Sequence, residues 1–115
     1  MATNANKVVA QNQATADLIF NLAKKEGFSD IQATALVANS IQESSLNPGI
    51  KNFNPSSRDD SVGLFQLNFQ GGMGVDFARA KGISIADAKI LATDPTENAS
   101  FIIAKRMFVV KHFIL

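Results

Sequence analysis

The 115-residue chain contains no cysteine, tryptophan or tyrosine, and a single histidine, His112. The absence of cysteine excludes disulfide scaffolds, thiolate metal sites and cysteine nucleophiles. One histidine is too little for a His-rich metal site or a Ser–His catalytic relay. We therefore expect neither a metal nor a cofactor. Nine phenylalanines supply all of the aromatic surface.

The chain also has no excess of one charge and no long apolar run, and we expect no signal peptide. Lys and Arg number 11 against 10 Asp and Glu, so the net charge of +1 gives no electrostatic case for binding nucleic acid or anionic membranes. No stretch reaches the about 20 apolar residues of a membrane span. The first six residues are small and polar, and no apolar signal-peptide core follows them. A role outside the cell would require another route of delivery.

What remains is the composition of one globular domain over residues 1–115, with 46% apolar and 18% charged residues. Helical periodicity and capping signals predict helices over about Asn12–Lys25, Ser29–Ser44 and Ile85–Ala92, and a fourth that begins at Asp94. The expected N-caps are Ser29 with Gln32, Ser84 with Asp87, and Asp94 with Glu97. The fold class is therefore mostly α, and residues 1–11 are expected to be a flexible N-terminus.

A long polar segment separates the second predicted helix from the apolar stretch Val62–Phe69. Residues 45–61 are rich in Asn, Ser and Pro, and a loop of this length in a small domain is more often functional than idle. Any sheet is expected within this segment. Asp59 and Asp60 are adjacent, so in an extended chain they point in opposite directions. Gly71 to Gly74 resembles a phosphate-binding loop only superficially, because no Lys-Ser/Thr pair follows it.

Glu43 is the main candidate for chemistry among the chain's three glutamates. Glu97 is expected to cap a helix, and Glu26 lies beside two lysines at a helix end. Glu43 lies near the end of an apolar helix, with no Lys or Arg between Lys25 and Lys51. Partial burial and the negative end of the helix dipole would both favour its neutral form, as a general acid requires. The structural alternative is a half-exposed glutamate at a helix end.

Three motifs in order resemble those of the lysozyme-like soluble lytic transglycosylases and goose-type lysozymes. Ala35–Pro48 is similar to the family's catalytic helix, which ends in Glu-Ser. The segment Ser61–Asn68 resembles Gly-Leu-Met-Gln, with Phe65 in place of Met, and Asp94–Asn98 resembles Asp-Pro-x-x-Asn. The resemblance covers roughly residues 15–108.

This resemblance implies a lysozyme-like fold, with a long polar loop or minimal β-hairpin beside the catalytic helix. It implies cleavage of the β-1,4 bond between N-acetylmuramic acid and N-acetylglucosamine in peptidoglycan, with Glu43 as general acid and then base. The other residues expected to bind substrate are Ser44, Ser61, Gly63, Phe65, Gln66 and Asn68. Goose-type lysozymes carry Asp at the position of Asn68, which favours a lytic transglycosylase. Asp59 or Asp60 could still supply a second carboxylate, so a muramidase stays open.

Two departures from the family keep an alternative open, a non-catalytic structural or glycan-binding module of a larger assembly. The family's downstream Tyr-Asn-Ala-Gly segment is missing, and the chain stops soon after the Asp-Pro helix. Residues 107–115 are expected to be an interface with a partner or a second copy, or a truncated end. The apolar side chains of that interface are Phe108, Val109, Val110, Phe113, Ile114 and Leu115, with Lys111 and His112 facing solvent. By analogy with phage tail-associated lysins, the chain would reach the cell wall or periplasm as a virion component.

Overall fold

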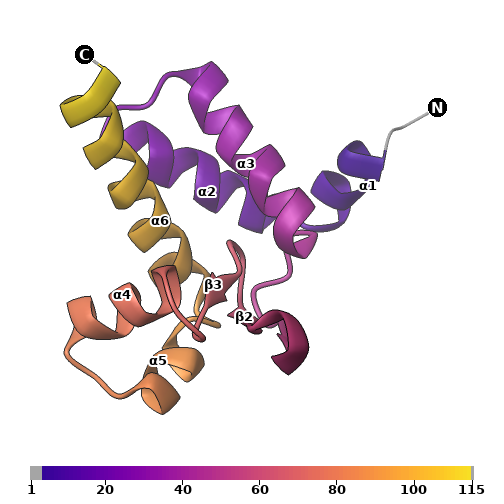
Figure 1. The fold of residues 1–115 in the computed structure, drawn as a ribbon. Helices are drawn as coiled ribbons and strands as arrows, with labels where there is room; N and C mark the ends of the chain where they lie inside the picture. Colours follow the sequence, from indigo (N-terminus) through magenta and orange to yellow (C-terminus); the bar gives the residue numbers. More distant parts are fainter. Residues whose placement is uncertain (1–3, 115) are drawn as a thin grey trace.

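Helices account for most of the fold (Figure 1), and the computed structural model describes the backbone of residues 4–114 and the side chains of residues 4–112. Helix α2 (Gln13–Glu26) packs against both α3 (Asp30–Ser44) and α6 (Pro95–Val109). Figure 1 shows these helices grouped at one end, and the strands with α4 (Met73–Lys81) and α5 (Ile85–Leu91) at the other. The mostly α, lysozyme-like fold expected from the sequence is confirmed.

The helix starts follow the capping signals. Ser29 and Gln32 form a reciprocal capping box at α3. The side chain of Ser84 accepts a hydrogen bond from the backbone N–H of Asp87 at the start of α5. The side chain of Asp94 likewise accepts from the N–H of Glu97 in α6. The Glu97 carboxylate itself pairs with Lys81 of α4 at 2.5 Å, so it ties two helices together instead of completing a capping box.

The long polar segment contains most of an antiparallel sheet of strand order β1-β2-β3. β1 (Lys51–Asn54) leads through the short 3-10 helix η1 (Pro55–Ser57) to β2 (Asp59–Val62), and β3 (Leu67–Asn68) follows a tight loop. The third strand lies beyond the expected segment. This sheet is the β-hairpin expected beside α3, extended by one short strand.

Two helices were not expected from the sequence. Helix α1 (Asn4–Gln11) lies within the segment expected to be flexible. Helix α4 begins at Met73, within the segment Gly71 to Gly74 that looked like a loop. Gly74 lies inside α4 because a Cβ there would come within 2.4 Å of the backbone oxygen of Asn68. This glycine therefore serves close packing of the helix against β3, not chain reversal.

The hydrophobic core joins both ends of the molecule. Ile19 of α2 and Ile103 of α6 are buried at one end, and Val62, Leu64 and Phe77 are buried near the sheet. Burial of each such side chain contributes roughly 1.5–3 kcal/mol. Across residues 4–114, no helix is both long and apolar enough to cross a membrane.

Candidate active site

Glu43 lies in the last turn of α3, and its side chain is exposed. The partial burial expected from its apolar helix is therefore wrong, because the apolar face of α3 is turned away from this position. Directly after the helix, Ser45 and Leu46 both adopt left-handed backbone conformations, with φ of 53° and 60°. Such conformations are unfavourable for residues other than glycine, and here the full burial of Leu46 offsets the cost. The double turn holds Glu43 at the point where the chain leaves the helix for the sheet.

The loop after β2 is fastened to α3 by two serines. The hydroxyl groups of Ser40 and Ser44 both donate to the backbone carbonyl of Leu64, at 3.0 and 2.8 Å. Both serines are buried, and Ser44 also donates to the carbonyl of Ser40. The structure thus places Ser44, an expected substrate contact, inside the protein. Its hydrogen bonds fix the loop beside Glu43.

The same loop is fastened to α6 by Asn98, the last residue of the Asp-Pro-x-x-Asn motif. Its side-chain oxygen accepts from the N–H of Phe65 at 3.0 Å, and its amide nitrogen donates to the carbonyls of Val62 and Ala92. Asn98 is fully buried. At Gly63, where φ is +86°, a Cβ would come within 2.3 Å of both Ala92 O and Asn98 Nδ2. The motif residues Gly63 and Asn98 therefore pack directly against each other, and the contact requires a glycine at position 63.

Phe65 and Gln66 complete the loop beside the helix. The Phe65 ring is 6% exposed, so it offers little surface to a ligand. Gln66 has a φ of 50°, and its amide nitrogen donates to the carbonyl of Gly63 at 3.0 Å. Its side-chain oxygen accepts from Asn52 of β1 at 2.7 Å. Gln66 thereby joins the loop to the edge strand of the sheet.

Arg106, which the sequence did not single out, lies at the same site. Its guanidinium donates to Asn39 Oδ1 at 2.6 Å, and Asn39 is one helical turn before Glu43. The guanidinium carbon lies 5.8 Å from the centre of the Phe65 ring. Partial burial lowers the pKa of Arg106, whereas the negative charge of Glu43 raises it. An arginine remains protonated at any physiological pH, so a fixed positive charge lies near Glu43.

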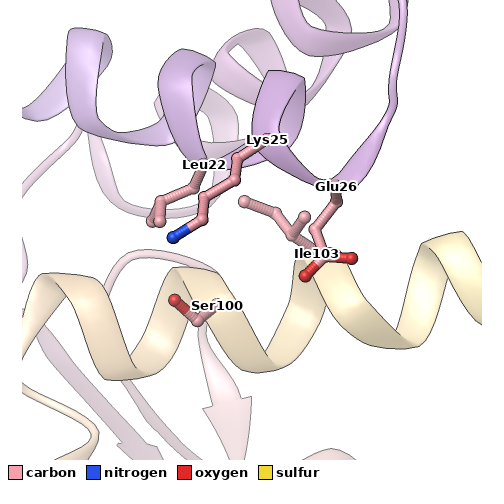
Figure 2. A pocket seen from close by; sticks show the side chains of 5 residues that line it. All are labelled: Leu22, Lys25, Glu26, Ser100 and Ile103. Atoms are coloured by element: carbon pink, nitrogen blue, oxygen red, sulfur yellow. The ribbon is translucent and has the colours of Figure 1, made fainter.

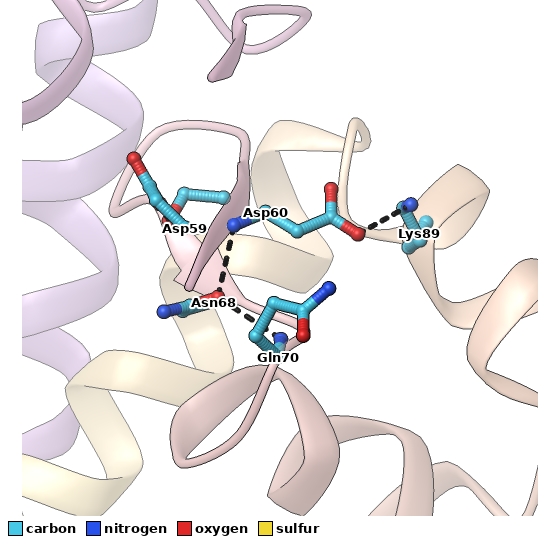
Figure 3. Close-up of polar contacts among 6 residues, drawn as sticks. Asp59, Asp60, Asn68, Gln70 and Lys89 are labelled. Carbon is cyan, nitrogen blue, oxygen red and sulfur yellow. Dashed lines mark hydrogen bonds and ion pairs between the residues drawn. The ribbon is translucent and has the colours of Figure 1, made fainter. Parts of the chain in front are cut away.

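The two aspartates of β2 point in opposite directions, as expected for neighbours in a strand (Figure 3). Asp60 pairs with Lys89 of α5 at 2.6 Å, in a contact where the Asp60 side chain is 15% exposed. Asp59 accepts a hydrogen bond from the hydroxyl of Ser61, which is itself buried. Both carboxylates thus have a partner within the protein.

Asn68 holds the turn between β3 and α4 together. Its side-chain oxygen accepts from the N–H groups of Asp60 and Gln70, as the dashed lines in Figure 3 show, and its amide nitrogen donates to the carbonyl of Arg58. An aspartate here could accept the same two bonds but could not donate to Arg58. The structure therefore gives the Asn at this position a local role of its own.

Two cavities lie away from these residues. One of about 140 Å³ lies between α2 and α6 and is lined by Leu22, Lys25, Glu26, Ser100 and Ile103 (Figure 2). The other, of about 340 Å³, is an open apolar hollow on α6, lined by Phe101, Ala104, Lys105 and Phe108. Glu43 lines neither of them. Among the described residues, no cluster of three histidine, aspartate or glutamate side chains could hold a metal ion.

Comparison with known families matches residues 14–98 to the family model of phage tail lysozymes. Comparisons with curated proteins and with solved structures gave no match. The matched region contains Glu43, the loop after β2 and Asn98, and it covers most of the chain. Together with the lysozyme-like fold, it indicates a lysozyme-like function that acts on peptidoglycan. The chain belongs to the phage tail lysozyme family.

Proposed function

We propose that the protein cleaves the β-1,4 bond between N-acetylmuramic acid and N-acetylglucosamine, with Glu43 as the general acid and then the base. The observation that carries this proposal is the position of Glu43. It is an exposed carboxylate held at the end of α3 beside a loop that α3 and α6 both fasten. Such double fastening is the rigid support that a catalytic group needs.

Because Glu43 is exposed, bound substrate would change the surroundings of its carboxyl group. In the free protein the side chain of Glu43 is in contact with water, and the positive charge of Arg106 lies near it. A glycan strand laid over Glu43 would exclude that water and bring the carboxyl group against the glycosidic oxygen. Glu43 would then donate its proton to the glycosidic oxygen as the C1–O bond breaks.

Of the two reactions open to such a site, we propose the lytic transglycosylase reaction. The acetamido oxygen of the muramic acid would attack its C1 as the bond breaks. Glu43, now ionised, would take the proton of the C6 hydroxyl group of the same sugar. The C6 oxygen would bond to C1 at the same time and displace the acetamido oxygen. Asp60 is paired with Lys89 and Asn68 carries no charge, which supports a route without a second carboxylate.

The other residues expected to bind substrate fall into two groups, those that hold the loop in place and those that could contact a sugar. Ser44, Ser61 and Gly63 are buried, so we assign them to fixing the loop. Asn68 is assigned to the turn after β3. Phe65 would support the side chain of Arg106, and Gln66 with Asn52 would present amide groups to sugar hydroxyls.

We also propose that the chain acts as a virion component that reaches the cell wall and that its last helix meets a protein partner. Phe108 and Val109 are 55% and 46% exposed on α6, beside the open apolar hollow. Lys111 and His112 are exposed, and the His112 ring stacks on Phe108 at 4.0 Å. The expected contacts at Phe113, Ile114 and Leu115 lie outside the described side chains.

The test is clearance of purified peptidoglycan by the wild type and by Glu43→Gln. Glutamine keeps the size of the side chain and removes the transferable proton, so we expect activity to fall about 10²- to 10⁴-fold. Glu26→Gln is the matched control, because Glu26 is also exposed at the end of a helix. Undiminished turnover in Glu43→Gln would remove Glu43 from the mechanism. A wild type that binds peptidoglycan without clearing it would favour the non-catalytic module.

A further inference from the structure

Arg106 is set apart from the other cations around it. On α4, α5 and α6, Lys81, Lys89 and Lys105 each lie within 4 Å of a carboxylate, their partners being Glu97, Asp60 and Asp76. Arg106 has no such ion pair with any described residue. Its guanidinium donates a hydrogen bond to the neutral amide of Asn39, which uses one of its five N–H donors. It therefore presents a positive charge with free donors at the surface.

The guanidinium is nevertheless held in place. Asn39 accepts from one of its terminal nitrogens, and the ring of Phe65 lies within cation–π distance of its central carbon. Phe65 is in turn fixed by Asn98, and Asn39 by its place in α3. A planar guanidinium held at two points has the geometry for a bidentate contact with a carboxylate.

The proposed substrate carries that group on only one of its two sugars. N-acetylmuramic acid has a lactyl ether, which ends in a free carboxylate or is joined to a peptide stem with carboxylates of its own. N-acetylglucosamine has neither. A fixed cation bound to Asn39, which lies one helical turn before Glu43, would distinguish the two sugars by charge.

We propose that Arg106, held by Asn39 and Phe65, forms a carboxylate-binding site that recognises the muramic acid side of the glycan beside Glu43. This inference rests on the proposed function for its substrate. It makes Arg106 a specificity-determining residue that places the muramic acid, and with it the scissile bond, relative to Glu43. The residue lies beyond residue 98, where the family match ends.

The experiment measures binding, so that it does not depend on cleavage. Soluble glycan fragments are titrated calorimetrically into Glu43→Gln protein in three forms: with a free lactyl carboxylate, with that carboxyl converted to an amide, and with a peptide stem attached. Arg106→Gln is then added to this background. Arg79→Gln is the matched control, because Arg79 is an exposed arginine on α4.

Loss of a charge-assisted contact should weaken binding of a carboxylate form about tenfold to a hundredfold, and leave the amide form within about twofold. A loss on the lactyl carboxylate assigns that group as the ligand, and a loss confined to the stem-bearing form assigns a stem carboxylate. Arg106→Lys should recover only part of the lost affinity, because lysine keeps the positive charge but lacks the paired N–H donors of the planar guanidinium. Arg79→Gln should leave all three affinities unchanged.

Equal weakening of all three forms would overturn the proposal, since it would make Arg106 a general support of the site. No weakening, or no binding of any fragment, would overturn it as well. These failures are distinct from a failure of the proposed function. Clearance of peptidoglycan that is lost in Glu43→Gln would keep the catalytic role of Glu43 whatever Arg106 does.

Discussion

The hydroxyl group of Ser44 donates a 2.8 Å hydrogen bond to the backbone carbonyl of Leu64, twenty residues away in the sequence. This bond joins the residue after the proposed catalytic glutamate to the centre of the Gly-Leu-Phe-Gln segment. The Glu-Ser pair of the helix motif thus has a physical meaning, in which one residue faces solvent and the other fixes the adjoining loop.

Substitution of Gly63 by alanine should severely destabilise the protein. The new Cβ would come within 2.3 Å of a backbone oxygen and of the Asn98 amide, at a φ of +86° that side chains disfavour. Gly71→Ala is the control, because a Cβ there meets nothing within 4 Å. Denaturant unfolding should show a large decrease in the free energy of unfolding for Gly63→Ala and little change for Gly71→Ala. Equal stability of the two variants would contradict the contact between Gly63 and Asn98.

Substitution of Asn98 by alanine should lower the free energy of unfolding by about 3 kcal/mol or more, because the buried Phe65 N–H loses its acceptor and the carbonyl groups of Val62 and Ala92 each lose a donor. The exposed Asn52→Ala, which loses one side-chain bond to Gln66, should cost less than about 1 kcal/mol. Free energies of unfolding from urea titration measure both. Comparable costs would show that the loop is held by other contacts.

Digestion of peptidoglycan should yield 1,6-anhydro ends, detected by mass spectrometry of the released fragments. The physical reason is that Asp60 is paired with Lys89, Asp59 accepts a hydrogen bond from Ser61, and position 68 carries an uncharged Asn, so the described residues of the sheet offer no unpaired second carboxylate to direct water. Asp59→Asn and Asp60→Asn should yield the same product. Reducing ends alone, with activity lost in either variant, would instead identify a hydrolase with a second carboxylate.

The wild-type protein should form a species larger than a monomer, or bind a partner, through the exposed apolar end of α6. Phe108→Ser should shift the mass measured by light scattering to that of a monomer. Ile90→Ser removes an equally apolar, 70% exposed side chain on α5 and should not change the mass. A wild type that is monodisperse and monomeric at high concentration would argue against self-association.

The parts of the fold that local sequence governs were predicted well. Ser29, Ser84 and Asp94 cap helices within three residues of themselves, so short-range patterns were sufficient. Helix α4 was missed because Gly74 is required by packing against Asn68, and a glycine seen without its neighbour indicates a loop. Helix α1 was missed because it is only eight residues long and buries none of them fully.

Only part of the candidate site could be predicted from the sequence, because the rest depends on contacts between distant residues. Glu43 could be singled out by elimination and by motif, but its exposure depends on how α3 is oriented in the fold. Arg106 carries no local signal, since its contact with Asn39 spans 67 residues of sequence. The buried roles of Ser44 and Asn98 likewise become visible only when the loop and α6 are seen together.

The contacts of Asn98 also set the order in which the site can form during synthesis. Its bonds reach back 33 and 36 residues, to Phe65 and Val62. At about 5–20 residues per second, a ribosome adds Asn98 roughly 2–7 seconds after Phe65. The nascent chain therefore carries Glu43 and its loop for seconds before α6 can fasten that loop from its second side. A newly made molecule acquires its completed site only after α6 has emerged.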